Sequence, residues 1–386
     1  MVYTQDEQDR ILALERYHGG EKPKTIYTSL GHSRYWFNKW LKRYDSDEPQ
    51  WFADKSTRPL TSPYRTPEEV EKIVCLTRQH LYNQGTFCGA QAILWQMEED
   101  GVLPLPSEST IKRLLRKHDL TNKRTGRYEP KGKKYPKLPE NKPNDVQQFD
   151  FVGPCYLEGA FRFYSLNAID TISRRCAIEA MTSKTDVYQS VWDVWKRLGI
   201  PRFAQFDNAM EFYGSPQYPR GMGQVIRLCL AHNVQAVFIP VREPWRNGKV
   251  EKFNDHWNGM FYSRVQMENE EELKGESLEF ETRHNHTWRY SPLGGKTPVA
   301  FLKESGTKLR FPSGPKPRKL SKPTKGKYHV MRFIRSNLCL DIFGEKFPMP
   351  AELKYEYVKA TVDVRTETLN LYSDNIKVAE LPYKLR

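Results

Sequence analysis

The chain has 386 residues, more than one hydrophobic core usually spans, so we expect two to four domains. Hydrophobic residues make up 38% and aromatic residues 13% of it, which is enough for packed cores and excludes wholesale disorder. Its six cysteines include no CxxC pair, which argues against structural zinc and against a disulfide framework. No apolar run approaches the roughly 20 residues that cross a bilayer, and the start lacks a signal-peptide core, so we predict a cytoplasmic protein with no membrane partner.

Positive charge is concentrated in two stretches of the chain. The net charge of +14 favours a polyanionic partner, most often nucleic acid. Residues 121–144 carry a net +6 and residues 303–327 a net +8, which together equal the whole excess. Both stretches are rich in Pro and Gly, so we predict basic linkers at 121–144 and 305–327. Solvated linkers are the simpler interpretation, but two strips flanking one domain favour DNA backbone contacts, in the first strip by Lys123, Arg124, Lys133 and Lys134.

Residues 1–48 are predicted to form a small helical domain. Helices are expected over 5–17, 23–30 and 33–44, with Ser33 as the N-cap of the third and a Gly-containing turn before it. This order is typical of a helix-turn-helix, whose second helix enters the major groove of DNA. A three-helix bundle without a DNA role is the alternative. The face expected to meet DNA carries Arg34, Tyr35, Asn38, Lys39 and Lys42.

The same pattern recurs at residues 64–120. Helices are expected over about 67–83, 89–100 and 107–117, and the last of them has the character of a recognition helix. Two such units in tandem favour a long, bipartite DNA site. The residues expected to meet DNA here are Ser109, Lys112, Arg113 and Arg116.

From residue 145 the pattern changes to strands that alternate with helices. Three consecutive strand-like runs, a helix, a strand, a helix, a strand and a further helix predict a mixed α/β sheet over 145–304. Residues 328–386 contain short β-rich pieces that predict a small C-terminal β-barrel. The predicted fold is therefore multidomain, with all-α units first, then a mixed α/β core, then the barrel.

Three carboxylates in the core stand out by context. The tripeptide QFD occurs twice and ends in Asp150 and in Asp207, each time within or after an apolar strand-like run where a bare charge is costly. Glu251 lies near the start of the helix in PWRNGKVEKFN, at the edge of an apolar stripe. Three such acids can hold two Mg²⁺ ions, which act on a phosphodiester in an in-line displacement, and Mn²⁺ is a candidate substitute in vitro. Other acids nearby are alternative candidates: Asp145, Asp170, Glu211, Glu243 and Asp255. Of these, Asp170 in NAIDTISR is expected to be only a turn residue at a strand end.

Basic and amide residues surround Glu251 in this segment. Lys249 and Lys252 are expected to hold the DNA backbone without entering the metal shell, and Asn247 is a further candidate DNA contact.

The spacing D-x56-D-x43-E, with QFDFVG, FDNAMEF, PWRNGKVEKFN and HNHTWRYSPLGGKTPVAFL, resembles the catalytic core of bacterial insertion-sequence DDE transposases and retroviral-type integrases. The resemblance covers about residues 66–304 and implies a ribonuclease H-like fold with Asp150, Asp207 and Glu251 as catalytic metal ligands. Two departures are that the second spacing is longer than is usual for the family, which the run at 213–223 can absorb, and that Ala209 replaces a usual Gly.

The resemblance implies a DNA transposase that binds the terminal repeats of a mobile element, cleaves at its ends and joins the 3′-hydroxyls to target DNA. Double-stranded DNA and a homo-oligomer, dimer or tetramer, are the expected partners, and an ATPase that selects targets is left open. Two alternatives remain: a DNA-binding regulator whose core has lost catalysis, and a ribonuclease H-like nuclease that only hydrolyses.

Overall fold

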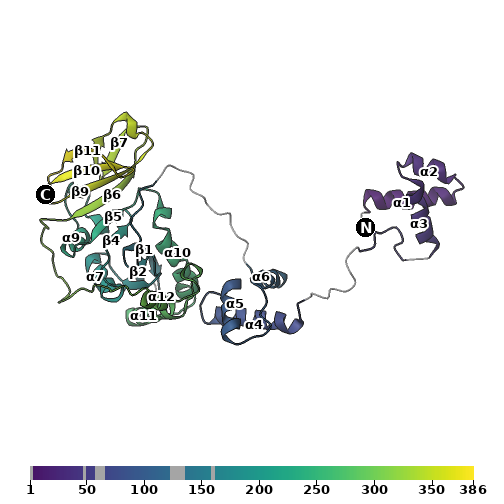
Figure 1. Cartoon of the computed structure of the whole chain (residues 1–386), viewed down its shortest axis with the longest axis horizontal. Coiled ribbons are helices and arrows are strands. Elements are labelled where there is room, and N and C mark those ends of the chain that lie inside the picture. The colour runs from purple at the N-terminus through teal and green to yellow at the C-terminus, as the bar shows by residue number, and fades with distance from the viewer. Residues whose placement is uncertain (1–2, 47–48, 57–65, 122–134, 158–160) are drawn as a thin grey trace. The chain divides into compact units, whose positions relative to one another are not determined.

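The computed structural model describes residues 3–46, 49–56, 66–121, 135–157 and 161–386, and the chain divides into two compact units, Met1–Thr66 and Pro67–Arg386 (Figure 1). The candidate DNA contacts Lys123, Arg124, Lys133 and Lys134 lie outside the described residues. No helix in the described ranges is both long enough and apolar enough to cross a membrane.

The first unit contains three helices, α1 (Gln5–His18), α2 (Pro23–Ser29) and α3 (Arg34–Asp45). Thr4 and Glu7 form a capping box on α1, and the Ser33 hydroxyl accepts from the Trp36 amide, so the predicted cap is confirmed. Four buried side chains form the core between the helices: Ala13, Leu14, Ile26 and Phe37. All five residues proposed for DNA contact lie exposed on α3. The three predicted helices are thus confirmed, whereas DNA binding stays a prediction.

A second group of three helices opens the second unit: α4 (Glu68–Asn83), α5 (Ala90–Glu99) and α6 (Glu108–Lys117). Ser107 caps α6 by accepting from the Thr110 amide. The buried side of α6 is formed by Ile111, Leu114 and Leu115. Ser109, Lys112, Arg113 and Arg116 all lie on its exposed side, as expected.

A nine-stranded mixed sheet forms the centre of this unit in the described part of the chain. Its strands are β1 (Val146–Tyr156), β2 (Arg162–Asp170), β3 (Cys176–Met181), β4 (Phe203–Phe206), β5 (Gln235–Phe238), β6 (Lys327–Phe333), β9 (Tyr357–Asp363), β10 (Thr368–Ser373) and β11 (Ile376–Pro382). The spatial order is β11-β10-β9-β6-β5-β4-β1-β2-β3. The first three strands, which are consecutive in the chain, pair antiparallel, and β1, β4, β5 and β6 pair in parallel.

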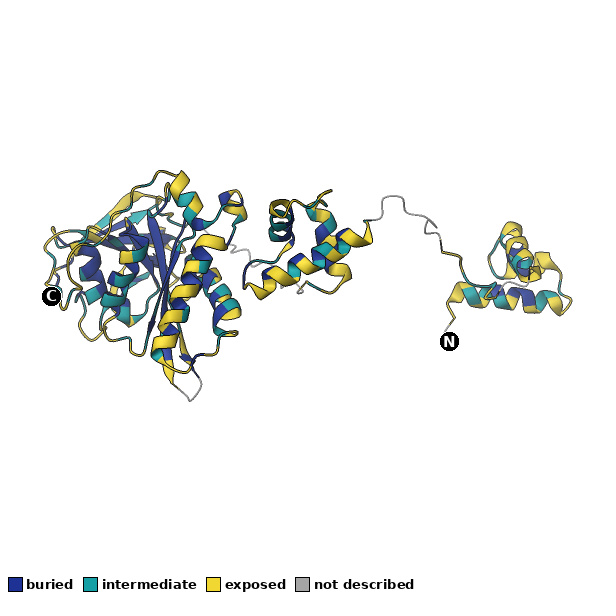
Figure 2. Ribbon diagram, turned by 90° about the horizontal axis from the view of Figure 1, so that it is seen from below, coloured by how far each residue is buried: buried dark blue, intermediate teal, exposed yellow. Residues whose placement is uncertain are grey.

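Helices cover both faces of the sheet around β1, β2 and β3, which leaves these strands largely buried (Figure 2), whereas the edge strand β11 is largely exposed. One face packs against α7 (Val187–Leu198), α8 (Met210–Tyr213) and α9 (Gln224–Ala231), with Trp195 fully buried there. The other face packs against α10 (Gly248–Trp257) and α11 (Glu270–Thr287), where Trp257 is fully buried, and α12 (Pro298–Glu304) follows. Alternate residues of each strand supply the two cores because successive side chains point to opposite faces.

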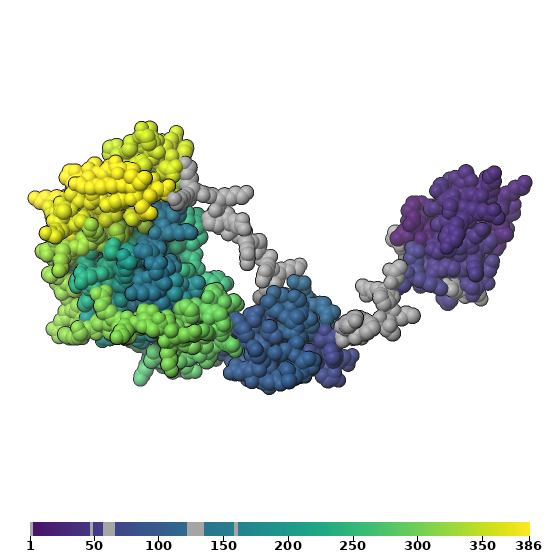
Figure 3. Space-filling view, viewed as in Figure 1, coloured from purple at the N-terminus to yellow at the C-terminus, as the bar shows by residue number. Residues whose placement is uncertain are grey.

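The C-terminal strands extend the central sheet, so the expected separate barrel is not confirmed. Strand β6 pairs in parallel with β5 at Val237–His329 and Phe238–Val330, and β9, β10 and β11 follow it in the same sheet. A two-stranded sheet of β7 (Cys339–Ile342) and β8 (Glu345–Pro348) lies apart from that order. Their apolar side chains join the same core as α7 and α9, and the C-terminal residues, yellow in Figure 3, cover one side of the unit.

The basic stretch before β6 lies along the core. The Arg310 carbonyl accepts from the Ile200 amide at 2.6 Å, and the Tyr188 hydroxyl donates to the Arg318 carbonyl. Farther along, the Leu320 amide donates to Gln224 on α9 at 3.2 Å. At its start, Lys308 and Arg310 line a cavity together with Lys142 and Arg202, so the ends of the two basic stretches meet at one place.

Gly199 packs closely against the basic stretch before β6, so a substitution at this residue can test that packing. Its φ of 87° and ψ of 162° fall in a region that is essentially restricted to glycine, and an added Cβ would lie 3.2 Å from the Arg310 carbonyl oxygen. We expect Gly199→Ala to lower the free energy of unfolding by about 1–3 kcal/mol, measured by urea denaturation. In the matched control Gly275→Ala the added Cβ meets no atom within 4 Å inside α11, so that change should stabilise by about 0.5–1 kcal/mol. Equal effects of the two changes would contradict this account.

Candidate active site

The two QFD tripeptides lie side by side in the sheet. Strands β1 and β4 run parallel with Gln148 opposite Gln205, which brings Asp150 and Asp207 to equivalent positions two residues farther on. The rings of Phe149 and Phe206 stack with centroids 5.1 Å apart in the core. Because side chains alternate along a strand, burying each Phe on one face directs the neighbouring polar residues away from that core. The repeated tripeptide therefore corresponds to two structurally equivalent segments on neighbouring strands.

The two glutamines of the repeat hold the helix that carries Glu251. Gln148 Oε1 accepts from the amides of Lys249 and Val250 at 2.9 and 3.1 Å, which satisfies two N–H groups at the start of α10. Gln205 Nε2 donates to the Arg246 carbonyl at 2.8 Å, in the turn η2 (Pro244–Asn247). The strands that carry the two aspartates thus fix the position of the helix that carries the glutamate.

A chain of amide side chains orients Asp150. Asn254 on α10 donates to Asp150 Oδ2 at 2.8 Å, and Asn167 on β2 donates to Asn254 Oδ1 at 2.8 Å. Ser165 in turn donates to Asn167 at 2.7 Å. Asp150 Oδ1 also accepts from the Phe151 amide at 2.9 Å. Strand and helix residues together therefore set the direction of this carboxylate.

None of the three acids forms an ion pair with a basic side chain within the described ranges. Asp207 accepts from the Ala209 amide at 3.0 Å, and Glu251 makes no hydrogen bond among the described residues. Burial first and the negative charge of Asp207 second raise the pKa of Asp150 to about 7; the charge of Glu251 adds less than the Phe151 amide removes. Burial also raises the pKa of Asp207 and that of Glu251. The site therefore holds acids whose negative charge is only partly offset.

The neighbouring acids differ because each has a structural partner. Asp170 is buried and accepts from Ser173 and Asn144, as expected for a residue of a turn at a strand end. Asp145 accepts from two backbone amides of residues 141 and 142. The remaining three pair with basic residues, namely Glu243 with Arg246, Asp255 with Lys252 and Glu211 with Lys184. Lack of a cationic partner thus separates Asp150, Asp207 and Glu251 from the last three, whereas Asp145 and Asp170 differ by being held in turns by neutral donors.

The three acids suit a hard divalent cation by their chemistry. All their donor atoms are carboxylate oxygens, the ligands that Mg²⁺ prefers, and a bound cation would relieve the charge that burial penalises. Within the described residues, no three acidic, histidine or cysteine side chains are gathered closely enough to form a ligand cluster. The three acids thus fit the cation by donor type and by charge, but they are not gathered into a ligand cluster in this structure.

Lys184 is a basic residue near the acids that the sequence did not reveal as important. It follows β3, its ammonium lies 4.2 Å from the ring centre of Phe151, and its charge lowers the pKa of both Asp150 and Asp207. Its ion pair with Glu211 on α8 is long, at 3.6 Å. Both residues line a cavity of about 490 Å³ beside α8 and α9. A cation here can meet an anionic group that approaches the acids.

The three residues near Glu251 that were predicted to contact DNA differ in their burial and partners. Asn247 is only 2% exposed, donates to the Phe149 carbonyl and accepts from Gln205, so our expectation of a DNA contact is wrong and its role is to hold η2. Lys252 is exposed and pairs with Asp255, and Lys249 is half-buried and pairs with Glu140. The two lysines remain candidate DNA contacts. The burial of Asn247 could not be predicted from the sequence, because the segment around it is rich in polar residues.

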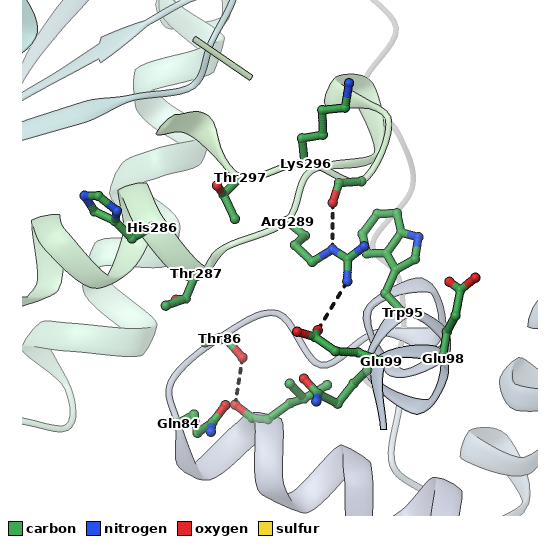
Figure 4. Close-up of a pocket in the computed structure, with 13 residues that line it drawn as sticks. Gln84, Thr86, Trp95, Glu98, Glu99, His286, Thr287, Arg289, Lys296 and Thr297 are labelled. Carbon is green, nitrogen blue, oxygen red and sulfur yellow. Dashed lines mark hydrogen bonds and ion pairs between the residues drawn. The ribbon is translucent and has the colours of Figure 1, made fainter. Parts of the chain in front are cut away.

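A second cavity, of about 710 Å³, lies between α5 and the segment that joins α11 to α12 (Figure 4). Arg289 stacks over Trp95, pairs with Glu99 at 3.6 Å and donates to the Gly295 carbonyl at 2.6 Å. Gly295 approaches the Trp95 ring so closely that an added Cβ would lie 2.9 Å from it. These contacts attach the second helical group to the core. None of the three acids lines this cavity, so it is separate from the candidate active site.

Comparison with known proteins gives structural likeness only. No protein-family model and no curated protein matches the chain. The HTLV-2 integrase catalytic core domain in complex with magnesium is 16% identical, with a TM-score of 0.32 over 42% of this chain and 99% of that one. The simian T-cell lymphotropic virus intasome in complex with PP2A regulatory subunit B56 gamma is 15% identical, with a TM-score of 0.37 over 80% and 96%.

The raised pKa of Asp150 predicts a pH-dependent stability. A carboxyl with a pKa of about 7 in the folded chain and 3.8 otherwise stabilises the fold fully below pH 3.8, and this contribution is lost as pH rises through about 7. In the presence of chelator, the melting temperature of Asp150→Asn should therefore exceed that of wild type by an amount that increases as pH rises from 5 to 8. The control Asp186→Asn removes an exposed carboxylate and should show no such trend. Melting curves of Asp150→Asn that parallel wild type at every pH would rule this out.

The role of Gln148 is tested by Gln148→Met, which keeps the length of the side chain and removes the acceptor. Two amides of α10 lose their partner, so we expect a loss of about 1–3 kcal/mol in the free energy of unfolding. Gln217→Met, at an exposed position, should stay within about 0.5 kcal/mol of wild type. Urea denaturation compares them, and a Gln148→Met protein as stable as the control would refute this role.

Proposed function

We propose that this chain is a DNA transposase of the insertion-sequence type, with a ribonuclease H-like core that joins DNA strands by phosphoryl transfer. One observation carries the proposal: the two QFD segments are paired in register, and their glutamines hold the helix with the third acid. Three partly buried carboxylates without cationic partners are expensive to maintain, and such groups gather at functional sites.

In this proposal Asp150, Asp207 and Glu251 hold two Mg²⁺ ions, with Mn²⁺ as a substitute. The ions would activate a water or a DNA 3′-hydroxyl and stabilise the leaving oxygen at phosphorus. Asn254 keeps one oxygen of Asp150 fixed, and the Ala209 amide does the same for Asp207. Lys184 stands beside these acids with a long ion pair that an incoming phosphate can replace.

The helical groups would supply recognition of the element ends. The exposed faces of α3 and α6 offer the residues expected to read DNA, and the exposed lysines in the described parts of the basic stretches, such as Lys137 and Lys319, offer backbone contacts. A dimer or tetramer on double-stranded DNA is part of the proposal because two ends must be held together for transposition. An ATPase that selects targets stays an untested hypothesis.

A disintegration assay on a branched oligonucleotide that mimics a joined product tests this function, with Mg²⁺, with Mn²⁺ and with chelator. Wild type should reseal the branch only with metal. Glu251→Gln should lose at least about a hundredfold, since losing even an outer partner of a metal ligand typically costs 10- to 100-fold. The control Glu271→Gln alters an exposed glutamate of α11 and should reseal like wild type.

The other outcomes identify the alternative functions. DNA binding with no resealing or cleavage in any metal would favour the regulator that has lost catalysis. Metal-dependent cleavage without resealing would favour the nuclease that only hydrolyses. Equal activity of Glu251→Gln and wild type would remove Glu251 from the site.

A further inference from the structure

We infer that two residues of the C-terminal strands, Arg332 on β6 and Tyr357 on β9, are positioning residues for the acids of the active site. Arg332 holds the segment that carries Asp207, and Tyr357 holds the turn that leads to Glu251. The inference rests on the proposed function, and it concerns residues outside the segments that carry the three acids.

Arg332 joins β6 to the ends of β4 and β5. Its Nη2 donates to Asn208 Oδ1 at 2.9 Å, directly after Asp207, and its Nη1 donates to the Ile239 carbonyl at 3.2 Å. Asn208 itself donates to the same Ile239 carbonyl at 2.7 Å, which closes a triangle of hydrogen bonds. The Asp341 carbonyl oxygen accepts a hydrogen bond from Arg332 Nε at 2.8 Å. The turn that contains Asp207 is thereby attached to a strand from the far end of the chain.

Arg332 is an expensive residue at this place. It is only 6% exposed, and burial lowers its pKa to about 10. Among the described residues it pairs with no carboxylate, and its donors meet only neutral oxygens. A well-packed apolar side chain of similar size would often stabilise a core more than a buried charge. Its contact with Asn208 gives a reason for an arginine here.

Tyr357 joins β9 to the turn before α10. Its hydroxyl donates to Glu243, with both carboxylate oxygens within 2.9 Å, and accepts from Arg246 Nη2 at 2.9 Å. Arg246 also binds Glu243 at 3.0 Å and lies over the ring of Tyr135 at 3.9 Å. The carbonyl of this same Arg246 receives the hydrogen bond from Gln205. The turn is therefore held from the sheet side by Gln205 and from the C-terminal side by Tyr357.

The two contacts act on different acids through separate elements. Asp207 and Glu251 belong to segments joined to the rest of the core by short turns, and misplacement by about 1 Å at a reacting group can cost 10²-fold in rate. Fixing each turn from two sides limits such displacement. The C-terminal strands therefore complete the site without contributing a ligand to it.

Two conservative variants of the full chain test the inference, each with a matched control. Tyr357→Phe removes one oxygen from a buried tyrosine and leaves the ring, and its control is Tyr372→Phe on β10, where the tyrosine is half-buried. Arg332→Met removes the charge and the guanidinium donors and keeps an unbranched apolar stem, and its control is Arg335→Met at an exposed position. Amide hydrogen exchange is measured on the metal-free protein, and Mg²⁺ alone is then titrated while the melting temperature is followed.

We expect Tyr357→Phe to speed amide exchange over residues 244–251 about fivefold to tenfold, the factor that one hydrogen bond of ordinary net strength supplies. Arg332→Met should do the same over 207–209. Both should raise the Mg²⁺ concentration for half-maximal stabilisation by a similar factor, and both controls should match wild type.

Exchange rates and Mg²⁺ midpoints of both variants that equal their controls would overturn the inference. A general fall in stability, with exchange faster across the whole sheet, would also overturn it, since that is the signature of a purely structural role. If wild type shows no stabilisation by Mg²⁺, the proposed metal site fails, and exchange over 207–209 and 244–251 still decides whether these residues position the two turns.

Discussion

The cost of burying carboxylates that have no basic partner sets the terms for the core of this protein. Asp150, Asp207 and Glu251 are partly withdrawn from water, and no basic side chain pairs with them among the described residues. Charges removed from water are costly when nothing offsets them. Such a site persists only if the surrounding fold prevents the acids from moving apart into solvent. The rest of the core can be understood as the apparatus that supplies this restraint.

Neutral amide groups supply most of the restraint. Gln148, Gln205 and Asn254 link the two strands to α10, and Asn254 also fixes the direction of Asp150. A lysine or arginine in these places would neutralise the acids and compete with a metal for them. Amides bind both donors and acceptors without adding charge, so they hold the geometry and leave the negative potential intact. Lys184 is the exception, and its ion pair is long.

The sequence was sufficient for the elements of the core and for the order of the three acids, because apolar periodicity and the repeated QFD are local features. It could also mark Asp170 as a turn residue. It could not show that Gln148 and Gln205 face each other, since register between strands depends on contacts distant in sequence. The same limit produced the expected barrel: strands at 328–386 look independent until β6 is seen to pair with β5. Asn247 was misjudged because polarity says nothing of burial.

The parallel pairing of β5 with β6 also orders events during synthesis. All the residues between Phe238 and Lys327, which include α10, α11 and α12, must leave the ribosome before β6 can join its neighbour. Synthesis proceeds at about 5–20 residues per second, and long-range parallel pairing is slow in itself. During that interval the turns after β4 and β5 lack their contacts with Arg332 and Tyr357. A nascent chain that already carries all three acids therefore passes through a stage at which they are present but not yet held in place.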